Sequence, residues 1–131
     1  MIVDTSAFVA VALREPGFQA LVAAMTERPA AMSAVSALEV RIVLGSDRFA
    51  LSDSALDVLF ERTGIHVIEF TSAHSQAAAA AYQRFGKGNH PARLNMGDCA
   101  SYATAQLAAR PLLFVGHDFA QTDIEAALSP N

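Results

Sequence analysis

Short, mostly apolar runs alternate along this chain with segments of helical periodicity, and this alternation limits the fold more than any other feature. The runs lie at residues 1–3, 31–33, 65–70 and 111–115. Strands that are apolar along their length, rather than at every second residue, are typical of a parallel sheet covered on both faces. We therefore expect one α/β domain over residues 1–131, with a central, mainly parallel sheet between two layers of helices.

The segments between these runs have helical character. Phe18, Leu21, Val22 and Met25 share one helix face, and Gly64 is a typical residue after a helix C-terminus. The pattern predicts helices at about 5–14, 18–28, 35–44, 51–63, 72–85 and 96–109, and a tail from residue 118 that is helical in short pieces.

Composition narrows the class of protein further. The chain is 53% hydrophobic with a formal net charge of −4, which excludes a disordered chain. A single cysteine excludes an intramolecular disulfide and favours a reducing, cytoplasmic location. Residues 70–83 are the longest stretch without a charged residue, and they are shorter than the ~20 residues of a membrane-spanning helix. We expect no membrane segment.

Four acidic residues lie at predicted element boundaries. Asp4 follows the first strand and Asp118 follows the last, while Glu39 and Asp98 are expected in the first turn of a helix. In a parallel sheet, the ends of strands and the starts of the following helices share one edge, so the four carboxylates are expected to converge there.

Each acid also has a structural interpretation. Ser36-Ala-Leu-Glu39 and Asn95-Met-Gly-Asp98 both have the spacing of a helix capping box, and Asp4 and Asp118 suit turns. A converged cluster, in contrast, would repel itself unless a cation neutralised it. Carboxylate oxygens select Mg²⁺ or Mn²⁺, and such ions assist the attack of water on phosphodiesters.

Four segments carry a family resemblance that spans the chain in order. They are Met-Ile-Val-Asp-Thr-Ser at 1–6, Ser-Ala-Leu-Glu at 36–39, Leu-Asn-Met-Gly-Asp-Cys-Ala-Ser-Tyr-Ala at 94–103, and Leu-Leu-Phe-Val-Gly-His-Asp-Phe at 112–119. With these segments the chain resembles the PIN-domain ribonucleases, and in particular the VapC toxins of bacterial toxin–antitoxin pairs.

The resemblance implies a PIN-like α/β/α fold and a metal-dependent endoribonuclease that acts as a toxin. It implies that Asp4 and Asp98 bind Mg²⁺ or Mn²⁺, and that Glu39 and Asp118 complete the catalytic acids. It further implies a homodimer and a small VapB-like antitoxin. Asp123 is an alternative fourth acid, although Thr-Asp-Ile-Glu at 122–125 also fits a capping box.

Substrate contacts are expected at two places. The resemblance implies that Thr5 or Ser6 positions a water or a phosphate. The loop between residues 84 and 93 contains Arg84, Lys87 and Arg93 with no acid between them, which suits RNA phosphates, although a solvated surface loop is the alternative.

Other functions fit less well. Receiver domains and haloacid-dehalogenase-like phosphatases also place an Asp after a strand, but Asp4 stands alone and Ser6 occupies the place of the phosphatase's second Asp. Cys99 lies in a predicted buried helix, which favours packing over nucleophilic catalysis. The remaining alternative is a catalytically inactive PIN-like module that binds an antitoxin or RNA.

Overall fold

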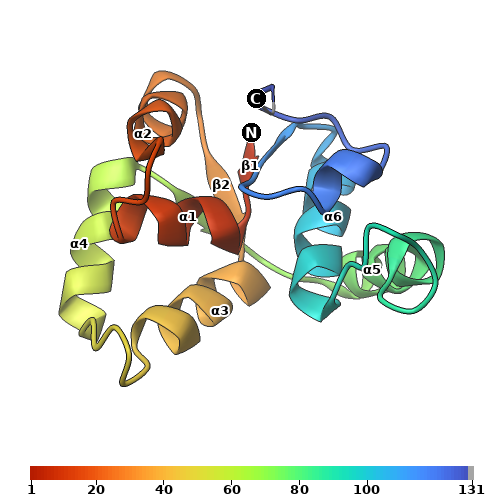
Figure 1. Ribbon diagram of the computed structural model, residues 1–131, viewed down its shortest axis with the longest axis horizontal. Helices are drawn as coiled ribbons and strands as arrows, with labels where there is room; N and C mark the ends of the chain where they lie inside the picture. The colour runs from red at the N-terminus through yellow and green to blue at the C-terminus, as the bar shows by residue number, and fades with distance from the viewer. Residues whose placement is uncertain (130–131) are drawn as a thin grey trace.

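A four-stranded parallel sheet forms the centre of the molecule (Figure 1). The computed structural model describes residues 1–129. The strands are very short and lie in the order β3-β2-β1-β4, so that β1 and β2 are central. Their bounds are β1 Ile2–Val3, β2 Ala31–Ser33, β3 His66–Ile68 and β4 Leu112–Leu113. All three pairings are parallel, as the alternation of apolar runs and helices predicts.

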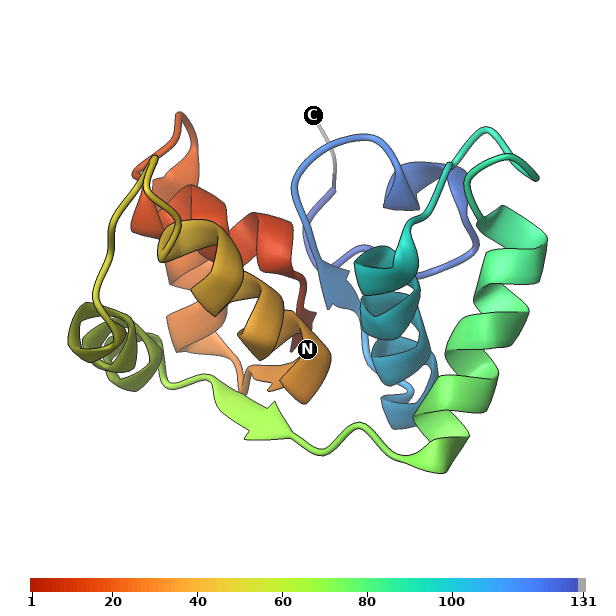
Figure 2. The same ribbon diagram turned by 90° about the horizontal axis from the view of Figure 1, so that it is seen from below.

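Helices cover both faces of this sheet. Figures 1 and 2 show α1 to α4 on one side of the molecule and α5 and α6 on the other, which confirms the three-layer α/β/α arrangement. The bounds are α1 Thr5–Ala12, α2 Phe18–Glu27, α3 Ala34–Leu44, α4 Asp53–Thr63, α5 Ser72–Phe85 and α6 Met96–Ala108.

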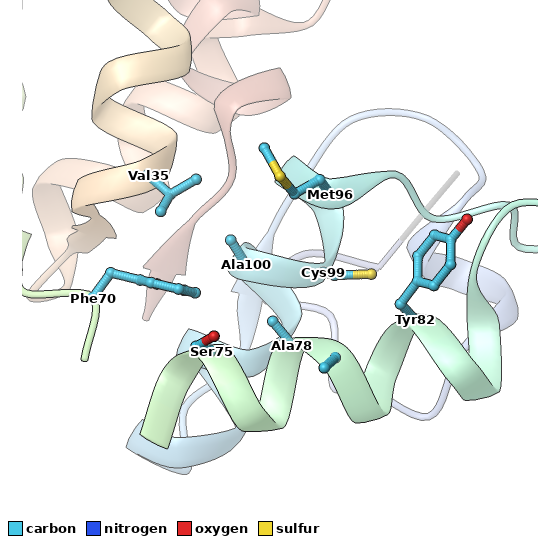
Figure 3. Close-up of a pocket in the computed structure, with 9 residues that line it drawn as sticks. Val35, Phe70, Ser75, Ala78, Tyr82, Met96, Cys99 and Ala100 are labelled. Atoms are coloured by element: carbon cyan, nitrogen blue, oxygen red, sulfur yellow. The ribbon is translucent and has the colours of Figure 1, made fainter. Parts of the chain in front are cut away.

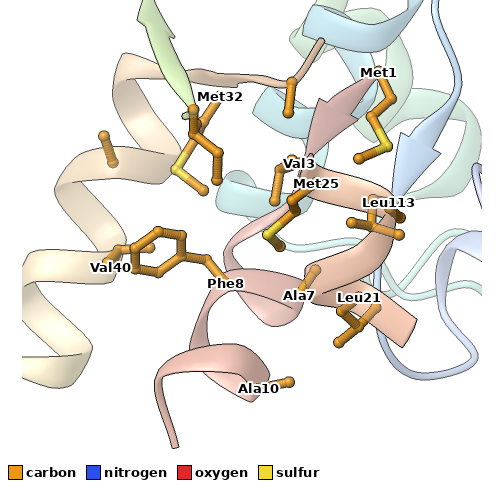
Figure 4. Close-up of a cluster of buried hydrophobic side chains, with 14 of the residues drawn as sticks. Met1, Val3, Ala7, Phe8, Ala10, Leu21, Met25, Met32, Val40 and Leu113 are labelled. Atoms are coloured by element: carbon orange, nitrogen blue, oxygen red, sulfur yellow. The ribbon is translucent and has the colours of Figure 1, made fainter. Parts of the chain in front are cut away.

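The two faces of the central strands enter separate hydrophobic clusters. Successive side chains of a strand point to opposite faces. Val3 and Leu113 accordingly pack with α1 to α4 (Figure 4). In this cluster Phe8 stacks on Phe60, with ring centroids 4.6 Å apart. Ile2 and its parallel partner Leu112 belong to the second cluster, under α5 and α6.

Hydroxyl, amide and carboxylate side chains fix where three helices begin. Asp4 caps α1, Ser33 caps α3 and Asn95 caps α6, each accepting a backbone N–H of the first turn. The predicted capping box at Ser36 and Glu39 is therefore wrong. Helix α3 begins earlier, so Ser36 lies inside its first turn and Glu39 in its second.

The tail differs from the helical pieces predicted for it. Only a 3₁₀ turn, η1 Phe119–Gln121, is helical in the described tail. Ala126 instead forms a parallel bridge with Leu112 beside β4, and the capping box predicted at 122–125 is wrong because no helix begins there. No helix within residues 1–129 combines the length and apolar character that crossing a bilayer requires.

Candidate active site

Asp4 is a buried carboxylate held by three hydrogen bonds. Its exposed fraction is 3%. Oδ2 accepts the Ser6 backbone N–H at 3.0 Å and the Ser6 hydroxyl at 2.6 Å, and Oδ1 accepts the Ser101 hydroxyl at 2.5 Å. Burial of a carboxylate is costly without such partners. The local sequence thus provides one partner, and helix α6 provides the other.

Asp98 lies on the first turn of α6 and has two roles in the geometry. It forms a reciprocal capping box with Asn95, as the spacing predicts: Asp98 Oδ2 accepts the Asn95 N–H at 3.0 Å, and Asn95 Oδ1 accepts the Asp98 N–H at 2.9 Å. The carboxyl is half-buried. Capping uses one oxygen, so the side chain retains acceptor capacity for a further ligand.

Glu39 reaches the start of α6 from α3. A Cβ atom added at Gly97 would lie 2.7 Å from Glu39 Oε2 and 2.9 Å from Oε1. The carboxylate therefore rests directly on the Gly97 backbone, beside Asp98. Only glycine leaves room for it there, which gives a physical role to the residue before Asp98.

The negative charges of the other three predicted acids act on Asp98. Burial is the main cause that raises the pKa of Asp98 to about 6, and the negative charges of Asp4, Asp118 and Glu39 raise it further, against the lowering effect of the Asn95 hydrogen bond. Asp118 is exposed and follows β4. The parallel sheet thus brings the four acids to one edge.

Within the part of the chain that the structure describes, these acids form no ion pair with a basic residue. The ion pairs within residues 1–129 are Arg41 with Asp53, Arg41 with Asp57, and Arg84 with Asp123. None involves the four acids at the sheet edge, so their negative charge is not neutralised by the protein itself. Uncompensated carboxylates of this kind suit a cation.

The donor chemistry fits a hard divalent cation. Among residues 1–129, no three His, Cys, Asp or Glu side chains are placed so that they hold one ion together. Mg²⁺, however, is usually bound by one or two carboxylates, with waters and substrate phosphate filling its other positions. Asp4 and Asp98, both oxygen donors of the same edge, match that smaller requirement.

A match to a protein-family model identifies the family of this chain. The model described as "PIN domain" matches residues 1–125. The chain belongs to the PIN-domain family. This match covers nearly all of the 131 residues predicted to form one domain.

Relatives of known name are similar to this PIN domain over almost the whole chain. Ribonuclease VapC36 of Mycobacterium tuberculosis H37Rv is 45% identical over 127 residues, which cover 95% of this chain and 91% of the relative. Ribonuclease VapC42 of the same strain is 45% identical over 130 residues, covering 97% and 98%. Ribonuclease VapC of Mycolicibacterium smegmatis is 40% identical, covering 96% and 98%. The resemblance to VapC proteins is confirmed.

Solved structures share the fold. A crystal structure of Mycobacterium tuberculosis VapC20, described as a toxin that cleaves the sarcin–ricin loop, is 16% identical with a TM-score of 0.73 and covers 98% of both chains. A toxin–antitoxin complex from Klebsiella pneumoniae is 18% identical with a TM-score of 0.67, covering 93% of this chain and 92% of that one. At these identities the likeness concerns the PIN-like fold.

Two buried serines of the PIN domain adjoin the site but were not predicted from the sequence. Ser101 bonds Asp4, and its Oγ lies 3.0 Å from Ser36 Oγ. Ser36 was interpreted only as a helix cap. The available signal was a hydroxyl one turn after Asp98, on the helix that carries this acid.

The hydroxyls predicted to contact substrate face different ways. Ser6 is half-buried and accepts the Val115 N–H at 3.1 Å while donating to Asp4. Thr5 is buried, and its Oγ1 lies 3.5 Å from the Ser36 carbonyl oxygen. Ser6 is therefore the hydroxyl that lies at the acidic edge, and Thr5 links α1 to α3.

Asp123 lies in a separate network. Its Oδ1 accepts the Tyr102 hydroxyl at 2.5 Å and its Oδ2 pairs with Arg84 at 3.1 Å. The hydrogen bond from Tyr102 is the main cause that lowers the pKa of Asp123. Asp118, in contrast, is near enough to Asp98 for its charge to raise the pKa of that carboxyl.

Two of the three basic side chains predicted to bind RNA lie together, and the third does not. Lys87 and Arg93 line a shared surface hollow of about 490 Å³ that also includes His90. Arg84 stands apart, paired with Asp123 and stacked over the Phe85 ring at 4.6 Å.

Cys99 lies under the site without taking part in it. The thiol is free and buried, and burial raises its pKa to about 11. A thiol with so high a pKa is not a nucleophile near neutral pH. This agrees with the packing role predicted for it.

An apolar groove of about 370 Å³ lies next to the start of α6 (Figure 3). Val35 and Phe70 lie at one end and Tyr82 at the other, with Met96 over the middle. Met96 is 80% exposed and Tyr82 is 43% exposed, so both side chains line the groove and neither belongs to the core.

Proposed function

We infer that this chain is a ribonuclease toxin of the VapC type. The observation that carries the inference is the meeting of four acidic charges at Asp98 with no basic partner among the described residues. The nearly full-length similarity to proteins named VapC ribonuclease supports the same conclusion and speaks against a PIN-like module without activity.

We propose that Asp4 and Asp98 hold a Mg²⁺ or Mn²⁺ ion. Both present oxygen ligands, and the acceptor capacity left on each suits a hard cation. When bound, such an ion stabilises negative charge on a phosphate and lowers the pKa of a coordinated water. The like-charge repulsion at Asp98 supports a cation at this edge.

Glu39 and Asp118 act on the water in this proposal. Each is an acid whose charge acts on Asp98, and neither has an ion-pair partner among residues 1–129. A carboxylate accepts hydrogen bonds from a water and orients its lone pair toward the scissile phosphorus. The Gly97 backbone under Glu39 restricts where that carboxylate can lie. Ser6 donates its one proton to Asp4, so it is proposed to position the same water by accepting a hydrogen bond from it, and not to hold a phosphate oxygen.

RNA phosphates are proposed to bind along the loop that precedes α6. Lys87 and Arg93 are exposed and share one hollow, and the loop continues directly into Asn95 and Asp98. Arg84 is the weaker candidate because its guanidinium already pairs with Asp123. Contacts of this kind position the substrate without reading its sequence.

Two protein partners follow from the VapC resemblance: a small VapB-like antitoxin and a second copy of the chain. The similar fold of the Klebsiella pneumoniae toxin–antitoxin complex supports an antitoxin. Exposed apolar side chains on α3 and α6, among them Leu38, Ile42 and Met96, support protein contacts, because such surface is typical of interaction sites. Light scattering of the purified protein should give a mass of twice 13.8 kDa; a monomer would contradict the dimer.

A location in the reducing cytoplasm is also proposed, and the free, buried thiol of Cys99 supports it.

The decisive experiment is RNA cleavage by the purified protein. A panel of tRNA, rRNA fragments and mRNA is incubated with Mg²⁺, Mn²⁺ or EDTA, beside Asp98→Asn and the control Asp47→Asn, which removes an exposed acid in the loop between α3 and α4. We expect cleavage that requires a metal, persists in Asp47→Asn and disappears in Asp98→Asn. Full activity of Asp98→Asn would overturn the ligand assignment. Cleavage of no RNA, with metal bound, would favour a binding module.

A further inference from the structure

A chain of buried hydroxyls joins α3 and α6 to the carboxylate of Asp4. Ser36 Oγ lies 3.0 Å from Ser101 Oγ, which lies 2.5 Å from Asp4 Oδ1. Both serines have an exposed fraction of 0%. The two helices pack against each other beside β1 (Figure 2). The chain therefore connects three of the elements that carry the acidic edge.

The direction of this chain follows from its chemistry. A carboxylate only accepts hydrogen bonds, and each serine hydroxyl has one proton. The proton of Ser101 goes to Asp4 Oδ1, so the proton between the two serines must come from Ser36. Both donors point toward Asp4, and aligned hydrogen bonds of this kind strengthen one another.

The other oxygen of Asp4 is held as firmly. Oδ2 accepts the N–H and the hydroxyl of Ser6, and the Ser6 hydroxyl in turn accepts the Val115 N–H at 3.1 Å. An ionised carboxylate has about four acceptor positions. Three are filled by protein donors, and the remaining one belongs to Oδ1, the oxygen that Ser101 holds.

The serines also fix the spacing of the two helices near the acids. Ser36 precedes Glu39 by one helical turn, and Ser101 follows Asp98 by one helical turn. Their hydrogen bond is thus a direct link between α3 and α6 at the level of the site. Two hydroxyls in this packed interior would be costly if they were not satisfied.

We propose that Ser101 is a positioning residue for metal binding, and that Ser36 acts through it. Ser101 holds the Asp4 carboxylate in one rotation, and so fixes where the free acceptor position on Oδ1 is offered to the cation. The proposal rests on the proposed function, because it concerns the cation that Asp4 and Asp98 are proposed to hold.

The test measures Mn²⁺ binding by isothermal titration calorimetry and apo-protein unfolding by circular dichroism. The variants are Ser101→Ala, Ser36→Ala and the double variant. Thr104→Val is the matched control, because Thr104 is a buried residue one turn further along α6 whose hydroxyl donates to the Ala100 carbonyl, at 2.7 Å.

We expect Ser101→Ala to raise the Mn²⁺ dissociation constant about 10- to 100-fold, which is typical of losing a partner of a metal ligand. Ser36→Ala should raise it less. The double variant should match Ser101→Ala, since Ser36 acts only through Ser101. Thr104→Val should bind Mn²⁺ as the wild type does. A purely structural role would lower the unfolding temperature without changing the dissociation constant.

Wild-type Mn²⁺ affinity in Ser101→Ala, or an equal loss in Thr104→Val, would overturn the proposal while leaving the metal-dependent ribonuclease intact. If Ser101→Ala does not fold, an unchanged dissociation constant in Ser36→Ala overturns it. A wild-type protein that binds no Mn²⁺ and cuts RNA equally well in EDTA would instead remove the proposed metal chemistry, and this inference with it.

Discussion

The Asp98 side chain has two effects on the stability of the protein, one favourable and one unfavourable. It caps α6 through Asn95, which stabilises the fold, and it is half-buried among three other acids, which raises its pKa to about 6 and costs stability when it ionises. The difference from the usual value of 3.8 corresponds to about 3 kcal/mol. Solvent screening at a half-buried group reduces this to about 1–2 kcal/mol.

Replacing Asp98 by Asn separates these two effects, capping of α6 and charge repulsion. The amide oxygen still accepts the Asn95 N–H, so the capping box survives, but the repelling charge is gone. We expect Asp98→Asn to unfold with a free energy about 1–2 kcal/mol greater than the wild type at pH 7 in EDTA, measured by urea denaturation. Asp47→Asn should leave the free energy unchanged. A destabilised Asp98→Asn would contradict the repulsion.

The same carboxyl predicts how the metal-free protein responds to pH. Because its pKa is higher in the folded state, the folded protein holds a proton that the unfolded chain has lost between pH 4 and pH 6. The contribution of Asp98 to the free energy of unfolding is therefore greatest below pH 4, and falls as pH rises through about 6. Urea denaturation in EDTA at pH 5 and 7 should show this fall, and Asp98→Asn should show less of it. Equal slopes would refute the assignment.

Individual site residues were predictable only where a local pattern determines them. Asp4, Asp98 and Asp118 stand at boundaries that the sequence marks, and their meeting follows from a parallel sheet. Ser36 was misinterpreted because Ser33 is an equally good helix start, and local sequence does not rank them. Ser101 could not be assigned because its partner Asp4 is 97 residues away in the chain.

At the level of the elements, α3 approaches the start of α6 closely, through Glu39 and Gly97. The Glu39 carboxylate occupies the place where Gly97 has no side chain. Glycine inside a helix is usually less stable than alanine by about 0.5–1 kcal/mol. The site therefore retains a residue that is unfavourable for the helix that carries it.

Gly97→Ala should affect stability and activity in opposite directions. The added Cβ would meet only the end of a flexible side chain, so Glu39 can turn away and the fold survives. We expect equal or greater thermal stability, and RNA cleavage reduced about 10- to 100-fold by the displaced carboxylate. The measurements are thermal unfolding and a cleavage time course. Unchanged cleavage would show that the position of Glu39 does not matter.

The loop before α6 gives a prediction about RNA affinity. RNA affinity falls with salt concentration, and each phosphate contact that is lost makes the slope of log affinity against log salt concentration shallower by about one. Lys87→Gln and Arg93→Gln, each made in Asp98→Asn to prevent cleavage, should reduce this slope in filter-binding titrations. Arg84→Gln should reduce it less, because Arg84 pairs with Asp123. Equal effects of all three would place Arg84 on the RNA as well.

The elements themselves were predicted better than their surroundings. Helix α5 and strand β1 follow from local composition, and their bounds agree with it. The β-branched run at 65–70 gives the clearest strand in the sequence, yet β3 is an edge strand with Val67 52% exposed, because strand order depends on contacts between distant segments. The tail was predicted helical, but its pairing with Leu112 outweighs local preference.

In the molecule as a whole, the acidic edge joins two helical layers that have separate hydrophobic clusters. Asp4 caps α1, which belongs to the hydrophobic cluster under α1 to α4, and Asp98 lies in the first turn of α6, which belongs to the cluster under α5 and α6. Repulsion between their carboxylates therefore acts between the two layers, across the carboxyl ends of the central strands. A cation shared by both side chains would reverse the sign of that interaction.

Metal binding should for this reason stabilise the entire domain and not only the site. At a free Mn²⁺ concentration 100 times the dissociation constant, the free energy of unfolding should rise by about 2.7 kcal/mol, on the order of 10 °C in Tm. EDTA should reverse the shift, and Asp4→Asn should abolish it. Asp47→Asn, which removes an exposed acid in the loop between α3 and α4, should keep it. A shift of equal size in Asp4→Asn would mean that the ion binds elsewhere, and that the acids at the sheet edge do not hold it.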